Sequence, residues 1–318
     1  MRHAGCEPAD TIFERTALPS ATDTRDGGAV ELTSVRKIAV IGAGTMGAGI
    51  AQTCAAAGFD VSMRDIEQRF VDGGLRRIRE PLMKRVEKGK MSEGEVEAIL
   101  AKIRGTVDLK EAVSGAQIVI EAILEKIDLK RELLAEMDRL CPPDVVFASN
   151  TSSLSITEMA NATKRADRVV GMHFFNPAPV MKLVEVIRGS ETSDATIDLI
   201  KDLSAKLGKE AVEVKESPGF VVNRLLVPMM NEAFNLLLEG VASPQDIDKA
   251  MKLGTNMPMG PFELADYTGL DIGLDVMEVL YRETHDPKFR PSPLLRKYVR
   301  AGRLGRKTGR GVYDYGAA

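Results

Sequence analysis

The fold of this chain is decided by a short glycine-rich stretch that reads Gly42-Ala43-Gly44-Thr45-Met46-Gly47. An apolar strand is predicted before it, over residues 36–41, and a helix after it that ends before Gly58. A second predicted strand, over residues 60–64, runs into Asp65, about 20 residues after the glycines. This order of strand, glycine-rich turn, helix, strand and acid is typical of a dinucleotide-binding unit.

Each glycine has a physical role in such a turn. Gly42 permits the tight turn, Gly44 lets the backbone approach a pyrophosphate, and Gly47 allows the helix to pack closely on the strand. The helix begins at Thr45 and Met46, where the free amides and the positive end of the helix dipole attract phosphates. The alternative is that the glycines only pack a helix onto a sheet.

Asp65 indicates which dinucleotide would bind. A carboxylate at the end of the second strand accepts hydrogen bonds from the adenosine ribose and repels a 2′-phosphate. We therefore predict NAD as the cofactor in preference to NADP, although the neighbouring Arg64 softens that preference.

Further predicted strands over residues 103–107, 117–120 and 145–148 alternate with helical stretches. This alternation implies an α/β fold with a doubly wound, mostly parallel sheet of the Rossmann type. Beyond Ser217 the patterns are helical only, with helices predicted over residues 221–239, from 244 onward, over 261–282 and over 294–301. We predict a disordered leader over residues 1–34, a Rossmann domain over 35–217 and a smaller all-α domain over 218–318.

Composition excludes several classes of protein. The 318 residues carry a net charge of −3 and no tryptophan, which argues against a nucleic-acid partner. No apolar run reaches the roughly 20 residues of a membrane span. The three cysteines, Cys6, Cys54 and Cys141, have neither disulfide nor metal-ligand spacing. We therefore predict a cytoplasmic protein without a metal, and the apolar helices of the second domain predict a homodimer.

A histidine and a glutamate form the predicted catalytic centre. His173 ends an apolar strand, a proline-containing turn over residues 176–179 reverses the chain, and Glu185 stands alone among apolar residues of the next strand. A buried carboxylate needs a partner, and a neighbouring imidazole would supply one. The pair is either a general-base dyad, with the free ring nitrogen as the base, or a core histidine satisfied by an acid.

Polar residues elsewhere have two interpretations each. Ser152 follows the predicted strand over residues 145–148 and either contacts a substrate or caps a helix. Asn223, at the start of the first helix of the second domain, either contacts a substrate, or caps that helix or docks the two domains. Lys84 and Lys88 belong to a basic helical hairpin that is either a solvated face or a site for a phosphorylated ligand. Pro81 is predicted to kink this helical stretch or to start a second helix.

With these pieces in place, the chain resembles the L-3-hydroxyacyl-CoA dehydrogenase family and is most similar to its bacterial 3-hydroxybutyryl-CoA dehydrogenases. The resemblance covers about residues 36 to 315. It rests on five motifs: Ile41 to Gly47, Ser149 to Ser155, Gly171 to Val186, Ser217 to Arg224 and Leu304 to Gly309.

The resemblance implies a role for each matching residue. His173 takes the proton of the 3-hydroxyl and Glu185 orients it, while Ser152 and Asn223 hold the reacting oxygen. Residues implied near the nicotinamide half of NAD are Glu125, Lys130, Asn176 and Lys307. Lys88 matches a lysine that grips coenzyme A. Lys84 is predicted to bind the substrate because it belongs to the same basic hairpin, and not from the resemblance. Pro81 is a departure, because some members carry a serine there that also touches coenzyme A.

We therefore predict an NAD-dependent dehydrogenase that oxidises an (S)-3-hydroxyacyl-CoA or reduces acetoacetyl-CoA. One alternative is a dehydrogenase of the same fold that acts on a free hydroxy acid. The other is a non-catalytic NAD-binding protein. The sequence of such a protein would lack His173, Glu185 or Ser152, but all three residues are present here.

Overall fold

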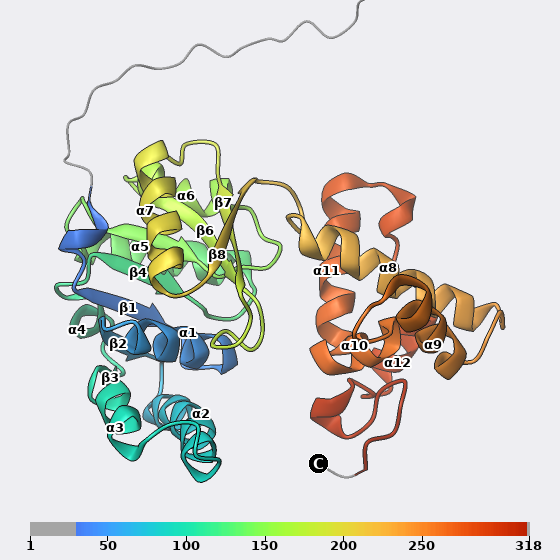
Figure 1. Ribbon diagram of the computed structural model, residues 1–318. Coiled ribbons are helices and arrows are strands. Elements are labelled where there is room, and N and C mark those ends of the chain that lie inside the picture. The colour runs from blue at the N-terminus through green and yellow to red at the C-terminus, as the bar shows by residue number, and fades with distance from the viewer. Residues whose placement is uncertain (1–29, 317–318) are drawn as a thin grey trace, which may run out of the picture.

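The computed structural model describes residues 30–316, which form a sheet-containing lobe and a helical lobe (Figure 1). The predicted disorder of residues 1–29 therefore lies outside the described residues. Within the rest of the predicted leader, Leu32–Ser34 form a 3₁₀ turn, and Val30 and Leu32 pack against the core. The prediction of a leader without regular structure is wrong for these residues, because their two apolar side chains are partly buried.

An eight-stranded sheet forms the first lobe, in the order β3-β2-β1-β4-β5-β6-β7-β8. All neighbouring strands are parallel except β6 and β7, which are antiparallel because a short turn joins them. The strands are β1 (Lys37–Ile41), β2 (Asp60–Arg64), β3 (Ile103–Thr106), β4 (Ile118–Glu121), β5 (Val146–Ser149), β6 (Val169–Phe174), β7 (Leu183–Arg188) and β8 (Glu210–Lys215). The predicted mostly parallel, doubly wound sheet is confirmed.

Helices cover both faces of this sheet (Figure 1). The helices of the first lobe are α1 (Thr45–Ala56), α2 (Gln68–Glu87), α3 (Glu93–Ala101), α4 (Leu109–Val113), α5 (Ile127–Leu140), α6 (Ile156–Ala160) and α7 (Asp194–Lys206). The second lobe holds α8 (Val222–Leu238), α9 (Pro244–Thr255), α10 (Pro261–Thr268), α11 (Leu270–Thr284) and α12 (Pro293–Arg300).

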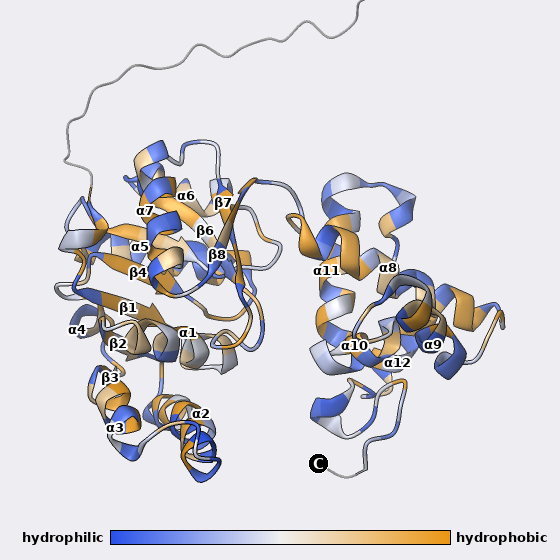
Figure 2. Ribbon diagram, viewed as in Figure 1, coloured by the Kyte–Doolittle hydropathy of each residue, from blue (hydrophilic) through white to orange (hydrophobic). Residues whose placement is uncertain are grey.

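Strand alternation divides the core of the first lobe in two. Along β1, Ile38 and Val40 enter one apolar cluster with α1, α2 and α7, whereas Ala39 and Ile41 enter another with α4, α5 and α6. Residues 38–41 of β1, 118–120 of β4 and 146–148 of β5 are therefore apolar on both faces of the sheet, and the hydrophobic colour of β1 is clear in Figure 2. A third cluster, built from α8 to α12, holds the helical lobe together.

Two predicted helices differ from the observed ones. The helix predicted over residues 261–282 is two helices, because Gly269 has a φ of 106° that ends α10 and begins α11. The helix α2 runs through Pro81 to Glu87, so the predicted start of a second helix at Pro81 is wrong. Within residues 30–316, no helix combines the length and the apolar character needed to cross a lipid bilayer.

Candidate active site

The glycine-rich turn between β1 and α1 has the geometry of a dinucleotide site. Gly42 has a φ of 112°, and a Cβ atom there would lie 2.4 Å from the carbonyl oxygen of Ala122. A Cβ atom on Gly47 would lie 1.9 Å from the carbonyl oxygen of Gly42, so α1 can approach the turn only with glycine at this position. A Cβ atom on Gly44 meets nothing within 4 Å, so the surface in front of this backbone is open.

Asp65 lies just beyond β2 and faces this turn. Its Oδ2 atom accepts a hydrogen bond from the Ala43 amide at 2.8 Å, and its Oδ1 atom accepts one from the Ile66 amide at 2.7 Å. Thr45 and Met46 open α1, which starts without a side-chain cap, so its first amides are available to a ligand. The residues present fit a dinucleotide with its pyrophosphate at the start of α1.

His173 and Glu185 meet across two antiparallel strands. They are register partners on β6 and β7, and His173 Nδ1 lies 2.8 Å from Glu185 Oε2. The histidine is 5% exposed and the glutamate 1%. A carboxylate at this distance fixes the imidazole tautomer with its proton on Nδ1. Within residues 30–316, Nε2 has no hydrogen-bond partner, so it is the nitrogen that remains for a substrate.

The second oxygen of Glu185 contacts the helical lobe. Oε1 accepts hydrogen bonds from the backbone amides of Val221 and Val222, each at 3.0 Å, where α8 begins. The carboxylate therefore has its hydrogen bonds satisfied by donors from both lobes, which accounts for a buried acid in an apolar strand.

Two aromatic rings flank the imidazole, and the sequence analysis missed both. The ring centroids of Phe175 and Phe220 lie 4.5 and 5.8 Å from that of His173. Phe220 is buried and has a φ of 52°, which directs the chain from β8 into α8. Their presence in two of the motifs that carry the family resemblance was the available signal.

Ser152 and Asn223 come together from different lobes. The Asn223 side-chain amide donates a hydrogen bond to the Ser152 carbonyl oxygen at 3.1 Å. The N-cap of α6 is Ser155, so Ser152 does not cap that helix. Asn223 does not cap α8 with its side chain either. For both residues, the helix-capping alternative is excluded, while the docking of the two lobes through Asn223 is observed.

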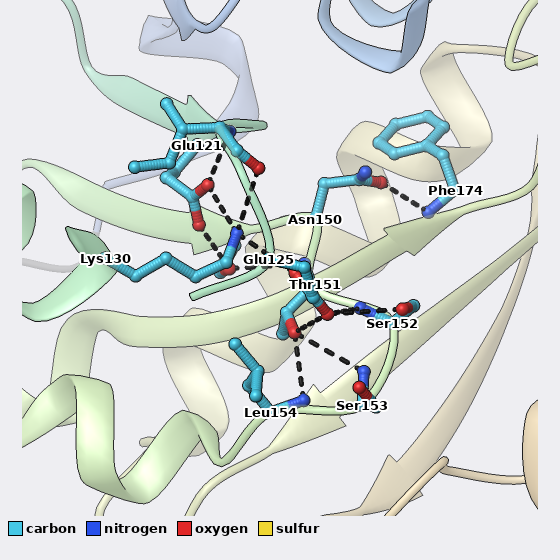
Figure 3. A network of polar contacts seen from close by, with 11 residues as sticks. Glu121, Glu125, Lys130, Asn150, Thr151, Ser152, Ser153, Leu154 and Phe174 are labelled. Atoms are coloured by element: carbon cyan, nitrogen blue, oxygen red, sulfur yellow. Dashed lines mark hydrogen bonds and ion pairs between the residues drawn. The ribbon is translucent and has the colours of Figure 1, made fainter. Parts of the chain in front are cut away.

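Glu125 organises the loop that carries Ser152 (Figure 3). Its Oε1 atom accepts hydrogen bonds from the Thr151 hydroxyl at 2.6 Å, the Ser152 amide at 2.8 Å and the Ser152 hydroxyl at 3.2 Å. Burial alone would raise the pKa of Glu125, but the Lys130 ammonium and these hydrogen bonds hold that pKa below its usual range. Glu125 is therefore ionised at neutral pH.

Lys130 is buried, at 1% exposure, although its implied role placed it beside a cofactor. Its ammonium lies 2.6 Å from Glu121 Oε1 and 3.3 Å from Glu125 Oε2 (Figure 3). In this arrangement the Lys130 ammonium is therefore not positioned to contact a ligand directly. Glu121, the last residue of β4, is a member of the network to which the sequence analysis assigned no role.

The comparison with known proteins decides the family. The family model described as "3-hydroxyacyl-CoA dehydrogenase, NAD binding domain" matches residues 37–217, and the one described as "3-hydroxyacyl-CoA dehydrogenase, C-terminal domain" matches residues 219–315. This chain belongs to the 3-hydroxyacyl-CoA dehydrogenase family. The predicted family, the NAD cofactor, the enzyme class and the Rossmann fold followed by a helical domain are confirmed.

Similar dehydrogenases extend over nearly the same length. The chain is 54% identical to the probable 3-hydroxybutyryl-CoA dehydrogenase of Bacillus subtilis, over 88% of this chain and 98% of that relative. It is 50% identical to the 3-hydroxybutyryl-CoA dehydrogenase of Clostridioides difficile, over 88% and 99%. The crystal structure of (S)-3-hydroxybutyryl-CoA dehydrogenase from Ralstonia eutropha has 53% identity, a TM-score of 0.84 and coverage of 89% and 100%.

Within residues 30–316, the remaining predicted site residues of this dehydrogenase form no hydrogen bond or ion pair with His173 or Glu185. Asn176 is exposed on the turn between β6 and β7. The Lys307 ammonium pairs with Asp271 of the helical lobe at 2.6 Å. Lys84 and Lys88 are exposed at the carboxyl end of α2. Within the described residues, no hydrogen bond or ion pair joins these four residues to the glycine-rich turn or to Ser152.

Proposed function

We propose that this dehydrogenase interconverts (S)-3-hydroxybutyryl-CoA and acetoacetyl-CoA. When bound at the glycine-rich turn, NAD would supply the hydride chemistry at C3 of the substrate. The observation that carries the proposal is the His173–Glu185 contact, in a chain about half identical to proteins named for this reaction. The alternative of a non-catalytic NAD-binding protein finds no support in these residues.

In the proposed reaction, His173 manages the proton that accompanies the hydride. Glu185 accepts the hydrogen bond from Nδ1–H, so Nε2 takes the proton of the 3-hydroxyl during oxidation and returns it during reduction. The Glu185 carboxylate then stabilises the positive charge on the imidazole. A positioned base of this kind contributes a rate factor of about 10² to 10⁴.

Ser152 and Asn223 are proposed to hold the reacting oxygen. The Asn223 side-chain amide donates to the backbone carbonyl oxygen of Ser152, which supports this assignment because it keeps the two residues side by side at one site. Lys84 and Lys88 are proposed to bind the phosphates of coenzyme A, and their exposure at the end of α2 leaves both ammonium groups accessible.

The proposal includes a homodimer in the cytoplasm. Large apolar side chains are exposed on the helical lobe, a feature typical of surfaces that bind another chain: Leu225, Leu238, Val241, Leu253 and Ile272. The two described cysteines, Cys54 and Cys141, are free and buried, which is compatible with a reducing compartment.

The proposed function is tested by following NADH oxidation with acetoacetyl-CoA and, in parallel, with acetoacetate. We expect turnover with the thioester and a kcat/KM at least about 100-fold lower with the free acid, because that acid lacks the coenzyme A contacts. Comparable rates with the two compounds would support the free-acid alternative, and no oxidation with either would refute the proposal. Replacing Lys88 by alanine should raise KM for the thioester and leave the rate with the free acid unchanged.

A further inference from the structure

The carboxylate of Glu121 is held rigidly at the carboxyl end of β4. Its Oε1 atom accepts hydrogen bonds from the Lys130 ammonium at 2.6 Å and the Ile123 amide at 2.7 Å, and its Oε2 atom accepts one from the Ser149 hydroxyl at 2.6 Å. Glu121 is a register partner of Ser149 on β5 and is 1% exposed. Its position is therefore set by the central strands of the sheet.

Lys130 links the buried Glu121 to the partly exposed Glu125. It comes from α5, and its ammonium lies between Glu121 Oε1, Glu125 Oε2 at 3.3 Å and the Ile123 carbonyl oxygen at 3.5 Å. Because the ammonium is desolvated, its position is determined by these oxygens and not by water. A fixed cation thus faces the carboxylate of Glu125 from the protein interior (Figure 3).

Glu125 is the point where the network reaches the proposed substrate site. It lies in the loop between β4 and α5, with 37% of its side chain exposed. One of its oxygens faces Lys130, and the other holds the Ser152 amide and hydroxyl. The contacts run from Glu121 through Lys130 and Glu125 to Ser152.

We propose that Glu121 is a positioning residue, which fixes the Lys130 ammonium so that Glu125 holds Ser152 in its reactive place. This inference rests on the proposed role of Ser152 in the reaction. It extends that role to a residue whose carboxylate accepts its hydrogen bonds from Ile123, Lys130 and Ser149 and not from Ser152.

Stability alone does not explain a buried glutamate–lysine pair at this place. The desolvation of two charges offsets most of their attraction, and apolar residues of similar volume stabilise a fold equally well or better. Two charges at the end of a central strand therefore indicate a role in placing other groups. The partly exposed Glu125 beside them is the group that the cation can place.

The chain offers a matched control for the loss of a buried ion pair. Arg165 and Asp138 form another pair in the same lobe, at 2.6 Å and with side chains 7% and 10% exposed. Arg165 otherwise donates to backbone carbonyl groups, including that of Cys141, and neither residue contacts the Ser152 loop. Asp138→Asn thus breaks a buried ion pair without touching the proposed site.

Three variants separate positioning from stability: Glu121→Gln, the double variant Glu121→Gln/Lys130→Met, and Asp138→Asn. Thermal unfolding and kcat with NADH and acetoacetyl-CoA are measured for each. Both single variants should lose thermal stability, and the double variant should recover part of it because the desolvated Lys130 ammonium is removed together with its Glu121 partner. Only the two Glu121 variants should lose kcat, by about 10- to 100-fold, as expected for a misplaced contact. A double variant with wild-type kcat would overturn the proposal.

Amide hydrogen exchange gives a second result that needs no substrate. The Ser152 amide donates to Glu125, so exchange over residues 151–154 should be at least about tenfold faster in both Glu121 variants and unchanged in Asp138→Asn. Unchanged exchange in the Glu121 variants would overturn the inference. A wild-type enzyme that is inactive with acetoacetyl-CoA would instead refute the proposed function, while hydrogen exchange would still decide the role of Glu121.

Discussion

Replacing Glu185 by glutamine removes one negative charge from the most buried part of the proposed catalytic centre. The carboxylate is 1% exposed. Its Oε1 atom accepts hydrogen bonds from two backbone amides, and its Oε2 atom faces His173 Nδ1. Glutamine has the same shape and one carbonyl oxygen. We expect that oxygen to keep the two amides of α8, so the side-chain NH₂ group takes the place of Oε2.

A donor at that position reverses the tautomer of the imidazole. Nδ1 must then accept a hydrogen bond, so the proton moves to Nε2, the nitrogen proposed to receive the substrate proton. The loss of a positioned base is worth a factor of about 10² to 10⁴ in kcat, or about 3 to 5 kcal/mol of transition-state stabilisation. The dissociation constant of NADH should change little, because Glu185 makes no contact with the glycine-rich turn.

The assay is NADH oxidation with acetoacetyl-CoA, accompanied by a fluorescence titration of NADH. Glu213→Gln is the control, since Glu213 lies on the neighbouring strand β8 and pairs with Arg188 near the surface. The control should retain wild-type kcat. If Glu185→Gln kept kcat within twofold of the wild type, Glu185 would have no part in the reaction and the tautomer reasoning would be wrong.

Two further predictions concern the cofactor and the response to acid. Asp65→Ala should bring the kcat/KM values for NADH and NADPH within about tenfold of each other, because the carboxylate no longer repels a 2′-phosphate; an unchanged preference would contradict its assignment. The pKa of Glu125 is lowered in the folded state, so its ionised form stabilises the protein above the unfolded value of about 4.3, and this contribution is lost as pH falls through the lower folded value. In urea unfolding between pH 3 and 7, the free energy of unfolding should therefore fall less steeply with decreasing pH for Glu125→Gln than for the wild type. Equal slopes of the free energy of unfolding against pH would contradict the ionised state of Glu125.

The sequence predicted the elements that have local signals. The glycine-rich turn, the alternation of strands and helices and the His173–Glu185 contact follow from spacing and from the cost of burying a lone acid. The break at Gly269 was missed, because a glycine within an apolar helical pattern predicts a break only weakly. In the structure, a Cβ atom there would lie 3.1 Å from Lys307 Nζ, a tertiary contact that the pattern does not contain.

The buried position of Lys130 was missed for a different reason. Its spacing places it on the inner face of α5 with Leu133, Leu134 and Met137, so the sequence did contain a signal for burial. A lysine on such a face requires an acidic partner, and Glu121 supplies it from a strand nine positions earlier. The links from Glu125 to Ser152 and from Asn223 to Ser152 could not be predicted, because they join loops and lobes that only the folded chain brings together.

The two oxygens of Glu185 face different parts of the molecule, and this has a consequence for motion. One oxygen orients the imidazole, and the other is held by the amides that open α8. A swing of α8 away from the sheet would release that second oxygen and let the carboxylate rotate off the ring. In the proposed reaction, the orientation of His173 as the base thus depends on the closeness of the two lobes, and an open molecule would lose that orientation until it closed.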